Sequence, residues 1–331
     1  MSEAWDRGAL RDPISADRPC GEDLEDSQQL AAIEGLRVFG AQVPHDPEPE
    51  WGDIRTKALE ALAVSKDLRL LAHLGAASLK TDGLPAFLDT LTIASMWLDT
   101  YWAEVYPVVE EDALLRINAL NCFADSMVVG VGLRHTPLVS SRQHGRYTLR
   151  DFEVAAGKEP PGEEPGPDPN QIDAAFADTP LAELEQLQQG VTGGIAALQQ
   201  IDATVRAAAG PDGPEFDLVS GHLERVDRVL RVQLDKHPDR QEAEGAAGVA
   251  EADREPGGTV TVGSIRTRED AIRALDAVAE FFRRNEPSSP VPLFIERAKR
   301  LVSKSFLEVL ADVAPDGLAQ AHTVGGVNVE G

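Results

Sequence analysis

The residues of this chain that could do chemistry begin with a short acidic cluster around one histidine. His45 stands beside Asp46, Glu48 and Glu50, a combination that a hydrolase or a metal site could use. A metal site needs further ligands at regular spacing, and no second histidine lies at such a spacing. The stretch also contains three alternating prolines within residues 41–50, which prevent a helix. We therefore expect a solvated loop here.

The other candidate groups lack the partners that their chemistry requires. Cys20 lies in PCGED, where the neighbouring acids disfavour the thiolate that a nucleophile needs. His135 has no serine or cysteine partner at a recognisable spacing. The GVG sequence at residues 130–132 lacks the third glycine of a dinucleotide fingerprint. Gly193 and Gly194 lack the Lys-Ser/Thr of a phosphate loop, and we interpret them as a helix break or kink.

The composition argues against several classes of partner. The chain carries 56 acidic and 31 basic residues, for a formal net charge of −25. This charge disfavours nucleic acid and anionic membrane surfaces, which attract clustered Lys and Arg. No apolar stretch is expected to reach the length of a membrane span, and the acidic start does not resemble a signal peptide. Two widely spaced cysteines predict reduced thiols. We expect a cytoplasmic protein with no cofactor, no bound metal, no nucleic acid and no direct membrane insertion.

The elements that position these groups are predicted to be helices. Trp51–Leu74 is typical of a tight helical hairpin, because Ile54, Ala58 and Leu62 recur at four-residue spacing and Asp67 is a suitable N-cap for a second helix. The surrounding pattern predicts three more helices, at Asp26–Phe39, Leu84–Tyr106 and Glu111–Val129. It also predicts a small β-hairpin at Pro137–Phe152.

The rest of the chain is predicted to consist of a helical middle section and a helix pair, separated by linkers. The predicted divisions are an N-terminal domain (1–154), an acidic Pro/Gly linker (155–170) and an aromatic-poor middle section (171–237). A flexible linker (238–263) and a C-terminal domain (264–331) follow. Whether the middle section packs on the N-terminal helices is left open. The fold class is therefore mainly α, with a possible β-hairpin and a small C-terminal oligomerisation domain.

The C-terminal helix pair carries many large apolar residues for its size. Its first helix is predicted to begin with a capping pair, Thr267 and Asp270, and its second with Ser289 as N-cap. The first helix is predicted to bury five apolar residues: Ile272, Leu275, Val278, Phe281 and Phe282. Roughly fifty residues make a marginal core, which favours self-association. The candidate contacts between copies are Phe281, Phe282, Phe294 and Phe306.

Three N-terminal blocks resemble the ImpA-type N-terminal domain of the TssA family of type VI secretion proteins. They are PISADRPCGEDLE at Pro13–Glu25, the hairpin sequence at Trp51–Leu70, and RINALNCFAD at Arg116–Asp125. A fourth block, Ile265–Leu318, resembles the C-terminal domain of the short class of that family. The matching motif positions, to which we assign a structural role, are Trp51, Arg55, Lys57, Lys66, Asp67 and Arg69. Arg55 and Arg69 are expected to pair with acids.

The resemblance implies a non-enzymatic assembly protein that forms a homo-oligomeric ring at the baseplate of the secretion machine. Such a ring helps to recruit or prime the tail tube and contractile sheath, and it contacts baseplate, spike, tube and sheath proteins. Two alternatives stay open at this point. One is a soluble helical adaptor or chaperone that forms no ring, and the other is a hydrolase that uses His45 or His135.

Overall fold

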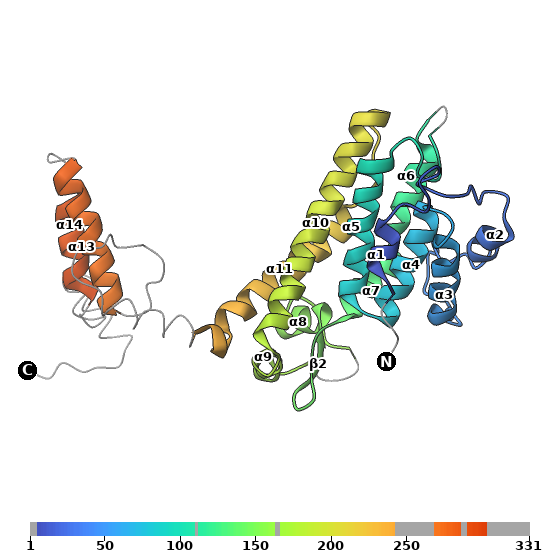
Figure 1. Ribbon diagram of the computed structural model, residues 1–331. Coiled ribbons are helices and arrows are strands. Elements are labelled where there is room, and N and C mark those ends of the chain that lie inside the picture. Colours follow the sequence, from blue (N-terminus) through green and yellow to red (C-terminus); the bar gives the residue numbers. More distant parts are fainter. Residues whose placement is uncertain (1–4, 110–111, 163–165, 242–267, 286–289, 303–331) are drawn as a thin grey trace, which may run out of the picture. The chain divides into compact units, whose positions relative to one another are not determined.

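The computed structural model describes residues 5–109, 112–162, 166–241, 268–285 and 290–302 (Figure 1). The chain forms two compact units, Met1–Gly248 and Val249–Gly331. Helices dominate the described parts of both units, and the sheet found there is one two-stranded antiparallel hairpin. The predicted fold class, mainly α with a small β-hairpin, is confirmed.

The first unit begins with five helices around a large apolar core. They are α1 (Arg7–Arg11), α2 (Gln28–Glu34), α3 (Trp51–Leu62), α4 (Leu68–Thr81) and α5 (Leu84–Tyr101). The helix predicted over Asp26–Phe39 is shorter than expected, because the chain turns after Glu34 and Arg37 adopts a left-handed φ of 48°. Residues 41–50 contain no helix, as their prolines predict.

The hairpin of α3 and α4 follows the predicted pattern. Ile54, Ala58 and Leu62 are all buried, and α3 packs against α4. Asp67 caps α4, since its side chain accepts a hydrogen bond from the backbone N–H of Arg69 at 2.8 Å. The connection spans five residues, Ala63–Asp67, so it is longer than the single-step break predicted from the sequence.

The single helix predicted over Glu111–Val129 is not observed, and the segment Leu114–His135 is divided instead. It consists of α6 (Leu114–Asn121), a 3₁₀ turn (Cys122–Ala124), a π-helical turn (Ser126–Gly130) and α7 (Val131–His135). Asp125 causes the break, because its ψ of 125° is not helical and its carboxylate accepts from the N–H groups of Met127 and Val128.

The same segment corrects the prediction about membrane spans. By length and composition alone, Leu114–His135 could cross a membrane, so the expectation that no stretch is long enough is wrong. Core helices of folded proteins satisfy the same criterion, and 39% of its apolar window is buried inside the structure. The segment also contains Arg116, whose side chain is buried and hydrogen-bonded within the first unit.

The predicted β-hairpin forms from β1 (Pro137–Ser141) and β2 (Gly145–Thr148). The strands are antiparallel, with Val139 opposite Tyr147. Helix α8 (Leu149–Ala155) follows immediately, because Thr148 and Asp151 form a capping box.

The middle section packs on the N-terminal helices, which answers the question left open by the sequence. Its helices are α9 (Pro169–Ala177), α10 (Leu181–Ala209) and α11 (Asp217–Lys236). Helix α10 lies along α5 and α11, and its buried residues join the core of the first unit (Figure 1).

Helix α10 is uninterrupted, so the break predicted at Gly193 and Gly194 is wrong. A Cβ atom at Gly194 would lie 2.5 Å from a methyl carbon of Leu88 on α5, whereas one at Gly193 would meet nothing within 4 Å. Gly194 thus permits close helix packing. The same holds at Gly132, where a Cβ atom would lie 2.7 Å from Leu79.

The described part of the second unit is a helix pair, α13 (Arg268–Asn285) and α14 (Val291–Val302). The pair buries Ala279 and Ile295, while Phe281, Leu293 and Phe294 are 57%, 75% and 67% exposed. Val278 is exposed as well, so the prediction that α13 buries Val278 and Phe281 does not hold for the pair alone. The predicted caps at Thr267 and Ser289, and the candidate contact residue Phe306, lie outside the described residues.

Candidate functional site

Three segments that are distant in the sequence meet at the connection between α3 and α4, and we call this place the hub. It consists of Cys20–Glu22, Val64–Leu68 and Val105–Pro107. The N–H groups of Glu22 and Lys66 donate to the carbonyls of Val64 and Cys20, at 2.9 and 2.8 Å. On the other side, the N–H group of Tyr106 donates to the carbonyl of Lys66 at 3.0 Å. The N–H group of Leu68 in turn donates to the carbonyl of Tyr106 at 2.9 Å. The connection is therefore held by backbone bonds on both flanks.

Gly21 allows the first of these contacts. Its φ is +75°, and a Cβ atom there would lie 2.1 Å from the carbonyl oxygen of Val64. A side chain at this position would collide with the backbone that it must pair with. The glycine of the PCGED sequence therefore serves the hub, beside a buried Cys20.

Lys66 is a fully buried cation at the centre of the hub. Its Nζ donates to the carbonyl oxygen of Leu10 at 2.8 Å and lies 4.9 Å from the centre of the Trp97 ring. Trp97 Nε1 donates to the same Leu10 oxygen, also at 2.8 Å. Burial lowers the pKa of Lys66, with partial compensation by Cys20 and Asp12. The side chain thus ties the end of α1 to the hairpin and to α5.

Asp67 and Arg69 form the charged pair that the motif leads one to expect. Arg69 Nη2 lies 2.7 Å from Oδ2 of the fully buried Asp67, and its Nη1 lies 2.6 Å from Oε2 of Glu25. Burial alone would lower the pKa of Arg69, but hydrogen bonds and charge from Asp67, and then Glu25, raise it overall. Arg69 therefore links the N-terminal block to the hairpin.

Arg116, on α6, contacts the hub and was missed by sequence reasoning. It is 1% exposed, and it donates four hydrogen bonds of 2.5–3.0 Å to the carbonyls of Trp102, Val105 and Pro107. Burial lowers its pKa to about 10. The available signal was an arginine inside an otherwise apolar helical stripe. The three blocks that resemble the ImpA-type domain thus converge, since one supplies Gly21, one Lys66 and one Arg116.

The remaining motif residues lie elsewhere on the hairpin. Arg55 pairs with Asp82 at 2.8 Å, and Lys57 pairs with Asp53 at 2.7 Å on the exposed face of α3. Trp51 Nε1 donates to Glu48 at 2.9 Å, and this bond is the largest cause of a lowered pKa of the Glu48 carboxyl. These contacts fix the start of α3 and its packing on α4.

The groups considered for catalysis are engaged in packing and backbone contacts. His45 Nε2 lies 2.8 Å from the carbonyl oxygen of Val38, and His135 Nδ1 lies 2.8 Å from that of Val131. Burial, with a further contribution from Glu104, raises the pKa of the Cys20 thiol to about 11, so the thiolate is disfavoured. Among the described residues, no group of three His, Cys, Asp or Glu side chains could hold a metal ion.

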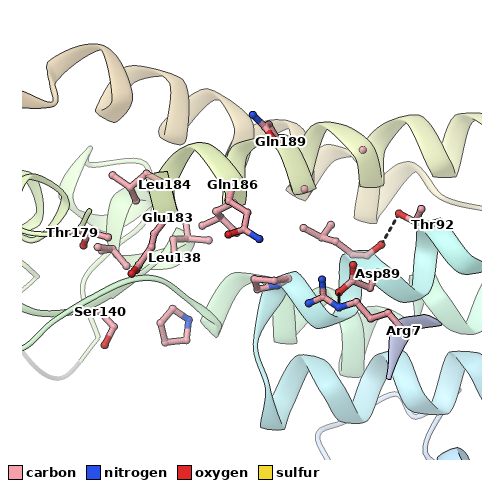
Figure 2. Close-up of a pocket in the computed structure, with 17 residues that line it drawn as sticks. Arg7, Asp89, Thr92, Leu138, Ser140, Thr179, Glu183, Leu184, Gln186 and Gln189 are labelled. Atoms are coloured by element: carbon pink, nitrogen blue, oxygen red, sulfur yellow. Dashed lines mark hydrogen bonds and ion pairs between the residues drawn. The ribbon is translucent and has the colours of Figure 1, made fainter. Parts of the chain in front are cut away.

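A groove of about 720 Å³ runs between α5, β1 and α10 (Figure 2). Two polar contacts lie within it: Arg7 pairs with Asp89 at 2.7 Å, and the Thr92 hydroxyl donates to the carbonyl of Leu88. Burial raises the pKa of Asp89, and Arg7 partly opposes this rise.

The fold is mainly helical, and buried charged side chains at the hub hold segments that are distant in the sequence together. The family model "ImpA, N-terminal, type VI secretion system" matches residues 11–125. The chain is 33% identical to the type VI secretion system component TssA1 of Pseudomonas aeruginosa, over 96% of this chain and 97% of that protein. The chain therefore belongs to the TssA family of type VI secretion components, which confirms the resemblance noted in the sequence.

A solved structure has the same fold as the first unit. It is the N-terminal domain, including the conserved ImpA_N region, of the TssA component from Burkholderia cenocepacia. The match has a TM-score of 0.56 and 24% identity, and it covers 70% of this chain and 95% of that chain. Such coverage is larger than the first 154 residues could provide.

Proposed function

We propose that this protein is a non-enzymatic assembly component of the type VI secretion system that forms a homo-oligomeric ring through its second unit. The ring joins the baseplate at the cytoplasmic base of the apparatus and displays the first unit as a docking domain. There it helps to recruit or prime the tail tube and the contractile sheath, through contacts with baseplate, spike, tube and sheath proteins.

The exposed apolar side chains of the helix pair carry this proposal. Phe281, Leu293 and Phe294 each have more than half of their surface exposed, and the described part of the second unit buries few residues. Phe282 is half-buried and packs edge-on against Phe281, with ring centres 5.5 Å apart. Covering such surface by copies of the same unit gains about 25 cal/mol per Å² of apolar area. A ring also multiplies weak docking contacts through effective concentration.

The test is the molar mass of the full chain in solution, measured by multi-angle light scattering. We expect an oligomer for the natural chain and a monomer for a chain truncated after Gly248. Phe281→Glu and Phe294→Glu should each reduce the mass, whereas Val43→Glu should not. Val43 is the matched control because it is an apolar residue of the first unit that is 68% exposed.

A natural chain that is monomeric at micromolar concentration would contradict the ring and favour the adaptor or chaperone. The hydrolase alternative is tested separately with His45→Ala and His135→Ala. Both variants should support assembly of the secretion apparatus as well as the natural chain does. Loss of assembly by a folded variant would revive that alternative.

A further inference from the structure

A second, smaller pocket lies between α8 and α11. It has a volume of about 290 Å³, and its apolar wall is formed by Leu149, Phe152, Val229 and Val232. Val232 is 53% exposed although it sits on a helix with a buried apolar face. Such a wall is unusual for a solvated helix surface and offers a place for one large apolar side chain.

The rim of this pocket is positively charged. Lys158, Arg225 and Arg228 line it, against one acid, Glu153. Glu153 is nearly buried, and its charge is compensated twice, by Arg225 Nη1 at 2.8 Å and by Arg134 Nη2 at 3.0 Å. Within the part of the chain that the structure describes, the side chains of Lys158 and Arg228 have no ion-pair partner.

The pKa of the neighbouring His222 reflects the same positive charges. Burial, followed by the positive charges of Arg225 and Arg134, lowers the pKa of His222 to about 4. His222 is therefore neutral at physiological pH, so it neither adds to the cationic rim nor reduces it. A local excess of positive charge stands out in a chain whose net charge is −25.

We propose that this pocket between α8 and α11 binds an acidic segment of a partner protein through one large apolar anchor. The anchor packs against Phe152, Val229 and Val232, and flanking carboxylates pair with Lys158 and Arg228. Arginine–carboxylate pairs are strong and directional, and complementary charge selects the partner. This inference is independent of the ring, because the pocket lies wholly within the first unit.

Calorimetric titration of the full chain with three synthetic peptides tests the proposal. The first peptide, acetyl-EEFLEE-amide, has both features that the pocket requires. The second, acetyl-EEGGEE-amide, lacks the anchor, and the third, acetyl-KKFLKK-amide, reverses the charge. We expect the first peptide to bind at least tenfold more tightly than either of the others.

Protein variants then locate the binding. Lys158→Glu combined with Arg228→Glu should weaken the first peptide at least tenfold, and Val232→Asp should do the same. The matched control is Arg142→Glu combined with Arg146→Glu. It changes the net charge equally, at exposed positions of the β-hairpin, and should alter affinity less than twofold. Circular dichroism checks that each variant folds.

Two kinds of result would overturn the proposal. Equal binding of the three peptides, or no binding of the first, removes the requirement for an anchored acidic segment. Equal effects of the two double variants remove the pocket as the location. Neither result would affect the molar mass that tests the ring.

Discussion

The two units of this protein treat large side chains in opposite ways. The first unit buries Trp97, Phe87 and Phe123 completely, and it also buries the cations of Lys66 and Arg116, which donate to backbone carbonyls. The second unit, in its described part, leaves Phe281, Leu293 and Phe294 largely exposed. The first unit has enough surface to close a core, and the helix pair does not.

This contrast underlies the roles proposed for the two units. The first unit closes a core of its own and bonds its buried cations to backbone carbonyls. The role proposed for the exposed apolar groups of the second unit is contact between copies of the chain. The hub is therefore a source of rigidity in the first unit, and substitutions there should cost stability.

The largest effect is expected from Arg116→Leu. It removes four hydrogen bonds and deprives the carbonyls of Trp102, Val105 and Pro107 of these donors, so it should lower the free energy of unfolding by about 4 kcal/mol. Urea unfolding followed by tryptophan fluorescence reports on the first unit, because all four Trp residues lie in the first 102 positions. Arg142→Leu, on the exposed β-turn, is the control. A stable Arg116→Leu chain would mean that the hub does not hold the first unit together.

The next effect is expected at Gly21, compared with Gly40. Both glycines have positive φ, +75° and +81°, but only Gly21 has a backbone oxygen in the way of a Cβ atom. Gly40→Ala should cost about 1 kcal/mol for its conformation, and Gly21→Ala at least about 2 kcal/mol more. The same urea experiment measures both. Equal losses would show that the contact with Val64 yields without cost.

A third comparison, between substitutions at Gly194 and Gly193, tests how much the close contact between α5 and α10 contributes to stability. Gly194→Ala brings a methyl group against Leu88, whereas Gly193→Ala meets open space and gains helix propensity. The first variant should be less stable than the second by about 2 kcal/mol. If both variants gain stability equally, Leu88 moves aside freely and the contact is loose.

The smallest effect is a pH dependence that depends on His222. Its pKa is about 4 in the folded chain against 6.5 for an unperturbed histidine, so the unfolded chain binds a proton more readily. Its contribution is fully present above pH 6.5 and is lost as the pH falls towards 4, which we expect to cost about 1 kcal/mol after solvent screening. His222→Gln should flatten stability between these pH values, and His135→Gln should not. An unchanged slope in His222→Gln would assign the dependence to other groups.

Much of the local structure followed from the sequence. The hairpin at Trp51, the cap at Asp67, the loop over 41–50 and the β-hairpin depend on spacing, capping and proline, which act over a few residues. The predictions that were wrong concern contacts between residues that are distant in the sequence. Asp125 ends one helical segment because its side chain caps the next. Gly194 lies within the uninterrupted helix α10, where the absence of a side chain allows close packing against Leu88 of α5.

The sequence by itself determined the helical class, the positions of most helices and the family, because these depend on periodicity and on recognisable blocks. Only the tertiary structure decided that these blocks meet at one hub, where Gly21, Lys66 and Arg116 hold three separate segments. Only it showed that α10 shares the core of α5, and that a cationic pocket exists on an acidic chain. The physical reason is that burial and hydrogen-bond partners are set by residues far apart in the chain, and sequence periodicity carries no record of those partners.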